Sequence, residues 1–445
     1  MEKTHQKKYY KHTPFSNVHL RIYLAIILGQ FTSGYAIKVS GTAIAEAQKY
    51  LQISSSWIGL IGAGTLIGLA GSVFVGKISD NIGRRRLLLV NMYILTIISL
   101  CQLFTSNLWL TLIFRIIIGL MIAIDYTVGN TLLIEWLPFK ESGKMQSHLI
   151  IYWVLGFIIA YFSGALITGF DSLTWKLIMA SPAIPGVITA VFRSFAKLPA
   201  SPSWLVNQGK PKKAQRIIQK HLGFKWGISK KQRKQVTKPS PVFSWTILFS
   251  KKYIRQTIVG GVFYASQSFT FFGISIFLPI LVTKMGISNT DLVGYLYNGC
   301  MLVGVLLGIR IFRNISRRHF LVGDFILAAV CLLVLSLWSS IPKGMSLLIF
   351  SFFSIVLSIG LVIDYPYTSE LFDSNVRGTG VGMVVTLSRV GAAAGTFLLP
   401  VITNGLGVKA SMLLCGLVLL LSGIFCFAFA PETSLRHSEK LTSEQ

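Results

Sequence analysis

The sequence predicts an all-α membrane protein in which twelve transmembrane helices form two pseudo-symmetric six-helix bundles. The first observation is composition: 53% of the 445 residues are hydrophobic and 13% are charged, whereas soluble domains contain roughly 25% charged residues. The second is that apolar runs recur along the chain, each long enough to cross a hydrocarbon core of about 30 Å. The third is that three motifs of the first half return in the second half in the same order.

Hydropathy divides the chain into twelve spans, with a long polar interval after the sixth. The first six are expected at 21–45, 56–78, 86–104, 108–130, 147–168 and 174–195. The last six are expected at 257–283, 289–312, 318–340, 345–368, 376–403 and 408–430. The predicted domains are an N-terminal tail (1–20), an N-terminal bundle (21–195), a central loop (196–256), a C-terminal bundle (257–430) and a C-terminal tail (431–445).

The basic residues, which give a net charge of +27, concentrate in alternate connections between the spans. In a soluble protein such a charge would suggest nucleic acid, but here the positive-inside rule explains it, and no nucleic-acid partner is expected. The rule places both termini and the central loop in the cytoplasm of a multi-pass protein of the cell (inner or plasma) membrane. The basic cytoplasmic face is expected to contact anionic lipid.

Three motifs of the first half have counterparts at the corresponding span edges of the second half. A tripeptide alone recurs by chance, but three ordered matches indicate that the halves arose by duplication and fold alike. The pairs are DNIGRR at 80–85 with RNISRR at 313–318, IDY at 124–126 with IDY at 363–365, and EWLPFKESG at 135–143 with ELFDSNVRG at 370–378.

GKISDNIGRRR, residues 76–86, resembles the signature loop of the major facilitator superfamily, G-x-x-x-D-x-x-G-R-[RK]. RIIIG, with Arg115 and Gly119, resembles the superfamily's R-x-x-x-G motif in span four. LPASPSWLVNQGK at 198–210 is similar to the sugar-porter sequence P-E-S-P-R-W-L, and PETS at 431–434 to the P-E-T ending of span twelve. The resemblance covers nearly the whole chain and implies two bundles rocking about a central substrate site.

DYTVGNTLLIEWLP at 125–138 resembles span four of bacterial metabolite–proton symporters, which have D-Y-P followed by glutamate ten residues after the aspartate. Asp125, Tyr126 and Glu135 match that spacing. Many family members also have an acid in span one that is implicated in proton coupling. Ala36 stands at that position here, so a proton site in span one lacks its usual residue.

Ionisable side chains inside a bilayer are costly and therefore mark candidate functional residues. Asp125 is a candidate proton carrier or substrate ligand, and the alternative is a structural ion pair with Arg115 or Lys38. Asp364, its counterpart in the second half, has the same two interpretations. Lys38 in span one would favour an anionic substrate, because Coulomb attraction strengthens in a low dielectric. Its alternative is a side chain that extends to the outer interface.

Arg389 in span eleven suits bidentate binding of a carboxylate, with a structural pair to Asp364 or Glu370 as the alternative. Polar and aromatic residues on spans that line the cavity in this family are further candidates, each with helix packing as its alternative. They are Gln30, Tyr35, Tyr126, Tyr152, Trp153, Tyr264, Gln267 and Asn298.

Charged residues at the cytoplasmic span ends are candidates for the gate that the resemblance implies. The expected ion pairs are Glu135 with Arg85, and Glu370 with Arg377 or Arg318; the alternative is unspecific interfacial charge. By resemblance, Asp80 contacts an arginine of its own loop and the N-terminal end of span eleven, where a carboxylate is favoured. The candidate gate residues are Gly76, Asp80, Gly83, Arg84, Arg85, Glu135, Arg313, Arg317, Arg318, Glu370 and Arg377.

Together these features predict a secondary active transporter that moves a small polar metabolite, an organic anion or a sugar-like compound, by alternating access with proton symport. A proton-independent uniporter or anion exchanger of the same fold is the first alternative, and a non-transporting sensor is the second. The proton is the expected coupling ion, no cofactor or metal is expected, and the chain is expected to be a monomer. An enzyme is not expected, since the sequence contains neither G-x-x-x-x-G-K-[ST] nor a nucleophile or metal-ligand constellation.

Overall fold

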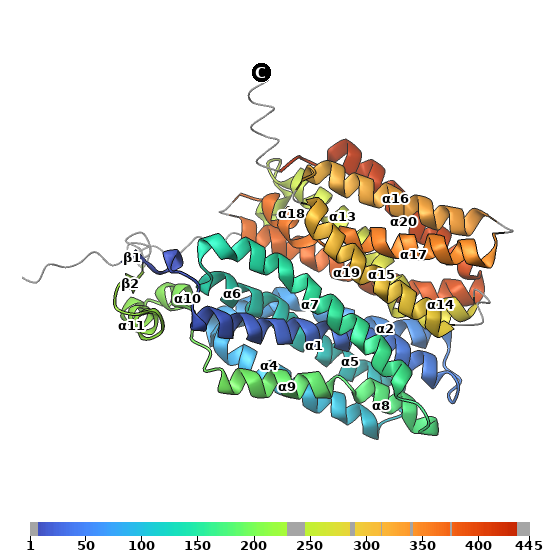
Figure 1. Ribbon diagram of the computed structural model, residues 1–445, viewed down its shortest axis with the longest axis horizontal. Coiled ribbons are helices and arrows are strands. Elements are labelled where there is room, and N and C mark those ends of the chain that lie inside the picture. Colours follow the sequence, from blue (N-terminus) through green and yellow to red (C-terminus); the bar gives the residue numbers. More distant parts are fainter. Residues whose placement is uncertain are drawn as a thin grey trace, which may run out of the picture.

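The computed structural model describes residues 8–228, 245–284, 290–312, 314–338, 341–373 and 376–433. Two groups of long helices lie side by side, one from each half of the chain (Figure 1). Ten described helices are long and apolar enough to cross a membrane. The other two spans are α2 continued by α3, and α13 continued by α14. The protein is therefore a multi-pass membrane protein with the twelve predicted helices in two bundles.

The first bundle begins at Asn17, a few residues before the predicted start of span one, and ends at Phe195. Its helices are α1 (Asn17–Ala47), α2 (Ser55–Ala70), α3 (Ser72–Ile82), α4 (Arg84–Cys101), α5 (Leu108–Ile124), α6 (Asn130–Trp136), α7 (Phe139–Leu166), α8 (Thr174–Ala180) and α9 (Ala183–Phe195).

The second bundle begins at Ile254 and ends at Phe429. Its helices are α13 (Ile254–Ile276), α14 (Leu278–Lys284), α15 (Thr290–Phe312), α16 (Arg317–Leu337), α17 (Lys343–Gly360), α18 (Asp364–Glu370), α19 (Arg377–Gly405) and α20 (Val408–Phe429).

Several spans are interrupted within the bundles. Residues 125–129 form one wide π-helical turn between α5 and α6, a local geometry found often at functional sites. The break between α8 and α9 coincides with Pro182, and Pro279 lies in the first turn after the break between α13 and α14. Proline lacks the backbone N–H that would continue the preceding helix, so it is accommodated better at a helix break or in a first turn than in a helix interior.

The two bundles meet along helices from both halves: α2 packs along α19, α7 along α15, and α1 against α13 and α14. The approach of α1 is very close at Gly41, where an added Cβ would lie 1.7 Å from the carbonyl oxygen of Ile276. Only glycine allows this backbone-to-backbone contact between helices. The contact surface is therefore built from helix pairs that reach across the two halves.

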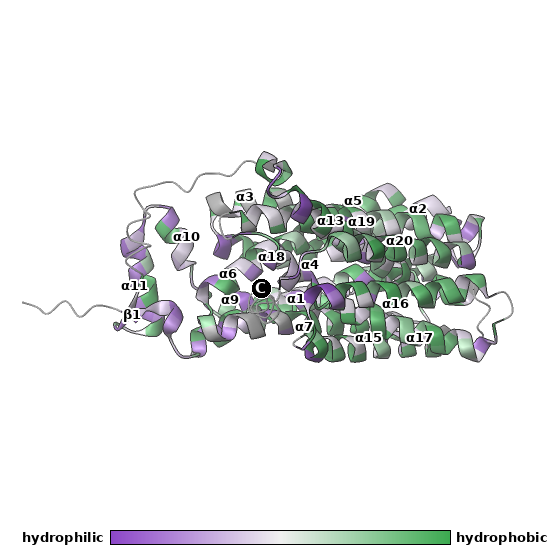
Figure 2. Cartoon of the chain, turned by 90° about the horizontal axis from the view of Figure 1, so that it is seen from above, coloured by the Kyte–Doolittle hydropathy of each residue, from purple (hydrophilic) through white to green (hydrophobic). Residues whose placement is uncertain are grey.

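We call the end of the molecule that contains residues 8–16, 196–228 and 431–433 the loop end. Short helices α10 (Pro202–Asn207) and α11 (Pro211–Leu222) lie there, beside a parallel two-stranded pairing of β1 (Lys8–Tyr9) with β2 (Trp226–Gly227). A small apolar cluster that includes Tyr10, Leu205 and Ile218 holds these elements together. Figure 2 shows the contrast: hydrophilic colour gathers at α11 and β1, and hydrophobic colour covers the long helices.

Candidate functional site

Asp125 forms a buried ion pair with Arg193 of α9. The Arg193 Nη2 and Asp125 Oδ1 atoms are 2.6 Å apart, and neither side chain is exposed. Asn91 Nδ2 donates to the same carboxylate at 3.3 Å, and Asn91 Oδ1 accepts from Arg193 Nη1 at 3.1 Å. Arg193 also donates to the carbonyl oxygens of Ala25 and Leu88. One guanidinium thus joins spans one, three, four and six.

The expected structural partners of Asp125 were wrong, because Arg193 takes that place instead of Arg115 or Lys38. Gly29 of α1 leaves room for the ion pair of Asp125 and Arg193, because an added Cβ there would lie 1.9 Å from Asp125 Oδ2 and 2.1 Å from Arg193 Nη2. Sequence reasoning missed Arg193 because it lies near the end of its span, where arginines usually record topology. The functional and structural interpretations of Asp125 both stay open.

Arg115 lies completely buried against the span-one position that lacks its usual acid. Its Nη2 donates to the carbonyl oxygen of Ala36 at 2.8 Å. Its Nε and Nη1 atoms have no hydrogen-bond partner among the residues that the structure describes. Arg115 therefore keeps a buried guanidinium beside the backbone of position 36.

Lys38 is buried at the contact between the two bundles. Its ammonium donates to the carbonyl oxygen of Ser275 on α13 and lies 5.0 Å and 5.2 Å from the ring centroids of Phe157 and Tyr161. None of its surface is exposed. The alternative that Lys38 extends to the outer interface is therefore wrong, because its polar and aromatic partners lie inside the protein.

Arg389 lies between the bundles and is only 4% exposed. Its guanidinium carbon is 5.5 Å from the ring centroid of Tyr126 in the first bundle and 5.9 Å from that of Tyr264 in the second. Asp364 interacts electrostatically with Arg389 and through a hydrogen bond with the side chain of Tyr264. The structure thus brings together four candidates that are distant in sequence. Glu370, the other expected partner, pairs elsewhere.

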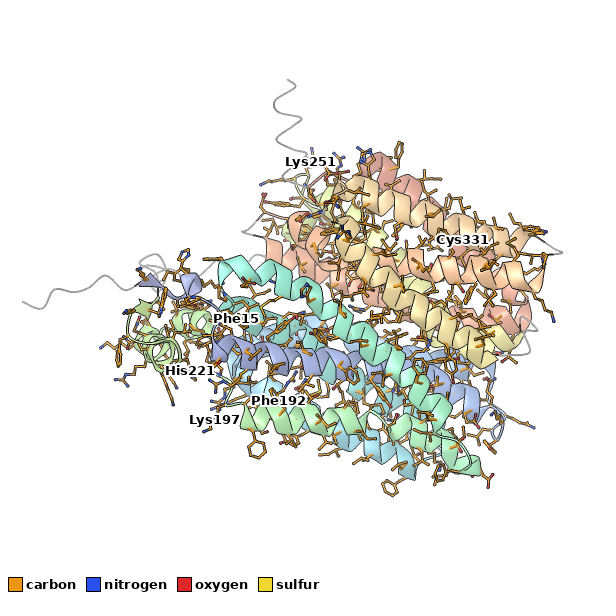
Figure 3. All side chains as sticks on the ribbon, in the orientation of Figure 1. Phe15, Phe192, Lys197, His221, Lys251 and Cys331 are labelled. Atoms are coloured by element: carbon orange, nitrogen blue, oxygen red, sulfur yellow. The ribbon has the colours of Figure 1, made fainter. Side chains whose placement is uncertain are left out.

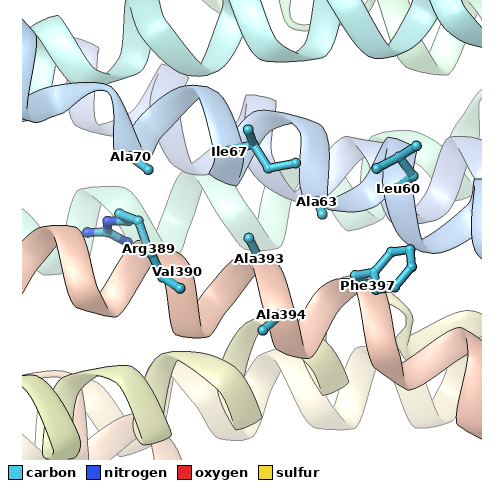
Figure 4. A pocket seen from close by; sticks show the side chains of 9 residues that line it. All are labelled: Leu60, Ala63, Ile67, Ala70, Arg389, Val390, Ala393, Ala394 and Phe397. Carbon is cyan, nitrogen blue, oxygen red and sulfur yellow. The ribbon is translucent and has the colours of Figure 1, made fainter.

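A groove of about 380 Å³ runs between α2 and α19 beside Arg389. Figure 4 shows Arg389 at one end, near Ala70, with Ala63 and Phe397 further along. The other lining side chains are all apolar. Arg389 is therefore reached along a seam between the two bundles, and a movement of one bundle against the other alters its surroundings.

Gln267 and Asn298 present amide groups to the interior of the second bundle. Both are buried, and Gln267 Oε1 and Nε2 and Asn298 Oδ1 have no hydrogen-bond partner among the described residues. Gln267 lies beside Asp324 of α16, since an added Cβ at Gly360 would lie 2.3 Å from Asp324 Oδ2 and 2.8 Å from Gln267 Nε2. Sequence reasoning missed Asp324, which stands alone in an apolar span without a repeated motif.

The other cavity candidates divide between the interface and the bundle interior. Trp153 stacks on Phe157 and faces Phe271 and Phe272 of α13, so it contributes to the contact between the bundles. Tyr35 hydrogen-bonds the hydroxyls of Ser163 and Ser181 within the first bundle, which favours helix packing for this residue. Gln30 is buried in α1, and Tyr152 is partly exposed.

An arginine–glutamate ion pair lies at the loop end of each bundle. Arg84 Nη1 pairs with Glu135, whose carboxylate also accepts from the Ser201 hydroxyl. The expected partner Arg85 was wrong, because its side chain is exposed. Gly83, at φ +97°, ends α3 and starts α4, which places Arg84 at the first helical position facing Glu135.

The second bundle repeats this arrangement with Arg317 and Glu370, whose Nε and Oε2 atoms are 3.3 Å apart. The expected partner Arg318 was wrong, since Arg317, which aligns with Arg84 in the duplicated motif, takes its place. The expected pairing of Glu370 with Arg377 stays a prediction, because the Arg377 side chain lies outside what the structure describes. Glu432 accepts the backbone N–H groups of Arg317 and Arg318 at 3.0 and 3.1 Å, and so caps the start of α16. Both pairs lie within their own bundle.

Some gate predictions fall outside what the structure describes. Arg313 lies outside the described residues. The burial of Gly76 and the side chains of Asp80 and Arg377 are not described, although the backbones of these residues belong to α3 and α19. The contacts expected for Asp80 therefore stay a prediction.

A basic cavity of about 850 Å³ opens at the loop end. His221 on its wall packs edge-on against Trp136, with ring centroids 6.0 Å apart. Burial, and then the positive charges of Arg21 and Lys220, lower the pKa of His221 from its usual 6.5. Figure 3 places His221 and Lys197 at this end, while Cys331 lies among the long helices. The cavity suits anionic groups, and lipid contact there stays a prediction.

Residues 19–444 match the family model described as "Sugar (and other) transporter". The chain belongs to this family of major facilitator transporters. The inner membrane metabolite transport protein YgcS of Escherichia coli is 30% identical over 94% of this chain and 93% of its own. The glucose transporter GlcP of Staphylococcus epidermidis is 26% identical over 95% of this chain and 96% of its own. This transporter is therefore not an enzyme.

Solved structures show the same fold. The partially occluded inward-open structure of the xylose transporter XylE from Escherichia coli superimposes with a TM-score of 0.80, at 19% identity. The match covers 94% of this transporter and 99% of XylE. The architecture of two six-helix bundles is thus that of known sugar transporters, which bind their substrates between the halves.

Proposed function

We propose that this transporter moves a small organic anion across the cell membrane by alternating access, together with a proton. The observation that supports the anion is Arg389, whose guanidinium is buried between Tyr126 of one bundle and Tyr264 of the other. A ligand held by this guanidinium contacts both bundles, as a substrate must when its site opens alternately to the two sides. Arginine is also the side chain best suited to hold a carboxylate through two hydrogen bonds.

Lys38 supports the same substrate class. It places a second buried cation at the contact between the bundles, against Ser275 and two aromatic rings. A positive charge in such a low-dielectric place attracts an anion more strongly than the same charge in water. Lys38 reaches the interface from α1 and Arg389 from α19, so both positive charges attract an anion that enters between the bundles.

A neutral sugar is the second candidate substrate, because the second bundle offers buried amides. The open hydrogen-bonding atoms of Gln267 and Asn298 suit sugar hydroxyls, which both donate and accept. The names of the relatives GlcP and XylE agree with this class.

Proton coupling is proposed from the carboxylates inside the spans. Asp125, Asp324 and Asp364 are all buried, and intramembrane carboxylates commonly form proton relays. The alternative is a proton-independent uniporter or exchanger. The basic loop end faces the cytoplasm and anionic lipid in this proposal, with both termini on that side, and the transporter acts as a monomer.

The substrate class is tested by thermal unfolding of the purified transporter with glucose, gluconate or benzoate. A ligand that binds the folded state raises the melting temperature by mass action. We expect a rise with gluconate or benzoate, little with glucose, and loss of the rise in Arg389→Lys, since lysine cannot form the bidentate contact. Arg216→Lys, on the exposed face of α11, is the matched control. Stabilisation by glucose alone would contradict the anion and support the sugar.

A further inference from the structure

Asp324 occupies an unusual place for a carboxylate. It is the eighth residue of α16, about 10 Å from the start of that helix at the loop end. The side chain is 7% exposed, and neither oxygen has a hydrogen-bond partner of ordinary geometry among the described residues. It interacts with the backbone of Gly360, and the amide of Gln267 lies beside it. An ionised carboxylate without a positively charged partner in such surroundings is costly, so this site favours the neutral acid.

Asp364 lies close enough to Asp324 for the two carboxylates to interact electrostatically. Asp364 is also buried, and its Oδ1 has no hydrogen-bond partner among the described residues. Its attractive neighbours are Arg389 and the side chain of Tyr264. In the second bundle Asp364 therefore lies between a second carboxylate, Asp324, and one guanidinium, Arg389.

The buried charges of the first bundle balance in a different way. There Asp125 faces Arg193 one to one, and the guanidinium has further partners in Asn91, Ala25 and Leu88. One negative and one positive charge cancel without a proton. In the second bundle the charges of Asp324, Asp364 and Arg389 cancel when one carboxylate is protonated, and neighbouring carboxylates resist simultaneous ionisation.

Other titratable groups around Asp324 do not change this balance. Helix α20, which packs along α16, contributes the thiols Cys415 and Cys426, and α13 contributes Tyr264, which interacts with Asp364. Lys343 and Lys409 lie in the first turns of α17 and α20, at the opposite end of the molecule from the loop end. Among the described residues of this region, Arg389 is the cation that interacts with the pair.

We propose that Asp324 and Asp364 together bind one proton, and that a substrate bound at Arg389 raises the affinity of these two carboxylates for the proton. Protonation forms one O–H bond on a carboxylate oxygen; release breaks it and passes the proton to water at the loop end. An anionic substrate that engages Arg389 competes with Asp364 for the guanidinium, so the carboxylates retain the proton while substrate is bound. The coupling is reciprocal: the bound proton strengthens substrate binding by the same factor. This coupling rests on the proposed function.

Infrared spectroscopy of the purified transporter during a pH titration tests the proton site directly, with the proton itself as the probe. We expect a protonated carboxyl signal in the wild type at neutral pH, and its loss in Asp324→Asn, which leaves Asp364 and Arg389 balanced one to one. Asp324→Glu should retain a signal. Asp171→Asn, in an exposed turn, should leave the spectrum and the transport activity unchanged.

Persistence of the full signal in a folded Asp324→Asn protein would overturn the proton site, and melting curves of the same samples show whether the variant is folded. The coupling is measured separately, by repeating the titration with gluconate or benzoate. A signal that disappears in Asp324→Asn but titrates at the same pH with and without a stabilising anion supports the site and refutes the coupling. The failures of the two proposals are thus distinguishable.

Discussion

Arg193, on span six, uses every N–H direction of its guanidinium on partners from spans one, three and four. Such an arrangement holds helices in fixed positions, and it leaves little freedom for Asp125 to change partners during transport. Arg389 has a different environment, with aromatic rings from both bundles and the carboxylate of Asp364 nearby. The buried charges of the first bundle are therefore held in a fixed network of hydrogen bonds, whereas Arg389 of the second bundle lies between aromatic rings of both bundles.

Asp125→Asn should destabilise the transporter strongly. The substitution leaves Arg193 buried without a counter-charge, and breaking a buried pair from one side costs about 3–5 kcal/mol. Unfolding of purified protein by heat or denaturant measures the loss, with Asp171→Asn as the exposed control. Wild-type stability together with abolished proton coupling would show instead that Asp125 carries the proton.

The contact between His221 and Trp136 should weaken in acid. Burial and neighbouring cations lower the pKa of His221 below its usual 6.5, so the unfolded chain binds the proton more readily than the folded one. The stability that this residue contributes is therefore complete above a pH of about 6.5 and declines as the pH falls towards the lower folded value. Amide exchange in α11 should accelerate over that range. An identical pH profile in His221→Gln would exclude this residue as the cause.

The candidate residues were predictable from sequence to the extent that they repeat or match motifs. Asp125, Asp364, Glu135 and Glu370 appear in the duplicated segments, and the structure places both glutamates in ion pairs at the loop end. Their partners were not predictable, because the choice between Arg84 and Arg85 depends on where α4 begins. Arg193 and Asp324 lie outside every motif, and only their three-dimensional neighbours distinguish them.

At the scale of helices, hydropathy located the spans but not their interruptions. A window of about 20 residues averages over one turn, so the π-helical turn at 125–129 and the break at Gly71 leave no trace in it. Proline marks two other breaks, at Pro182 and Pro279, in the sequence itself. Helix α11 (Pro211–Leu222) is easier to read from the sequence, since its polar and apolar faces alternate within a short segment.

Gly41→Ala should impair transport by disturbing the close contact of α1 with α13 and α14. The new methyl group would lie 1.7 Å from the Ile276 carbonyl oxygen, so the helices must separate there. Gly299→Ala on α15 is the matched control: nothing lies within 4 Å of its added Cβ, and alanine favours helix by about 1 kcal/mol. Initial uptake rates into vesicles compare the two. Equal rates in both variants would show that this contact does not limit transport.

At the scale of the whole molecule, the two halves are alike at the loop end and different in the interior. The pairs Arg84–Glu135 and Arg317–Glu370 occupy equivalent positions of the duplicated motifs. The related aspartates do not: Asp125 pairs with span six and Asp364 interacts with span eleven. The repeated motifs therefore predicted the architecture that the two halves share. Only the structure shows that the buried charges of the second half are arranged differently from those of the first.

Movement of an anion together with a proton can be followed in proteoliposomes that have a pH-sensitive dye outside. Gluconate or benzoate, whichever stabilises the protein, is added to the outer solution. We expect the outer solution to become more alkaline as substrate enters, with a slower change in Asp324→Asn. Substrate entry without any change in pH would contradict this coupled movement.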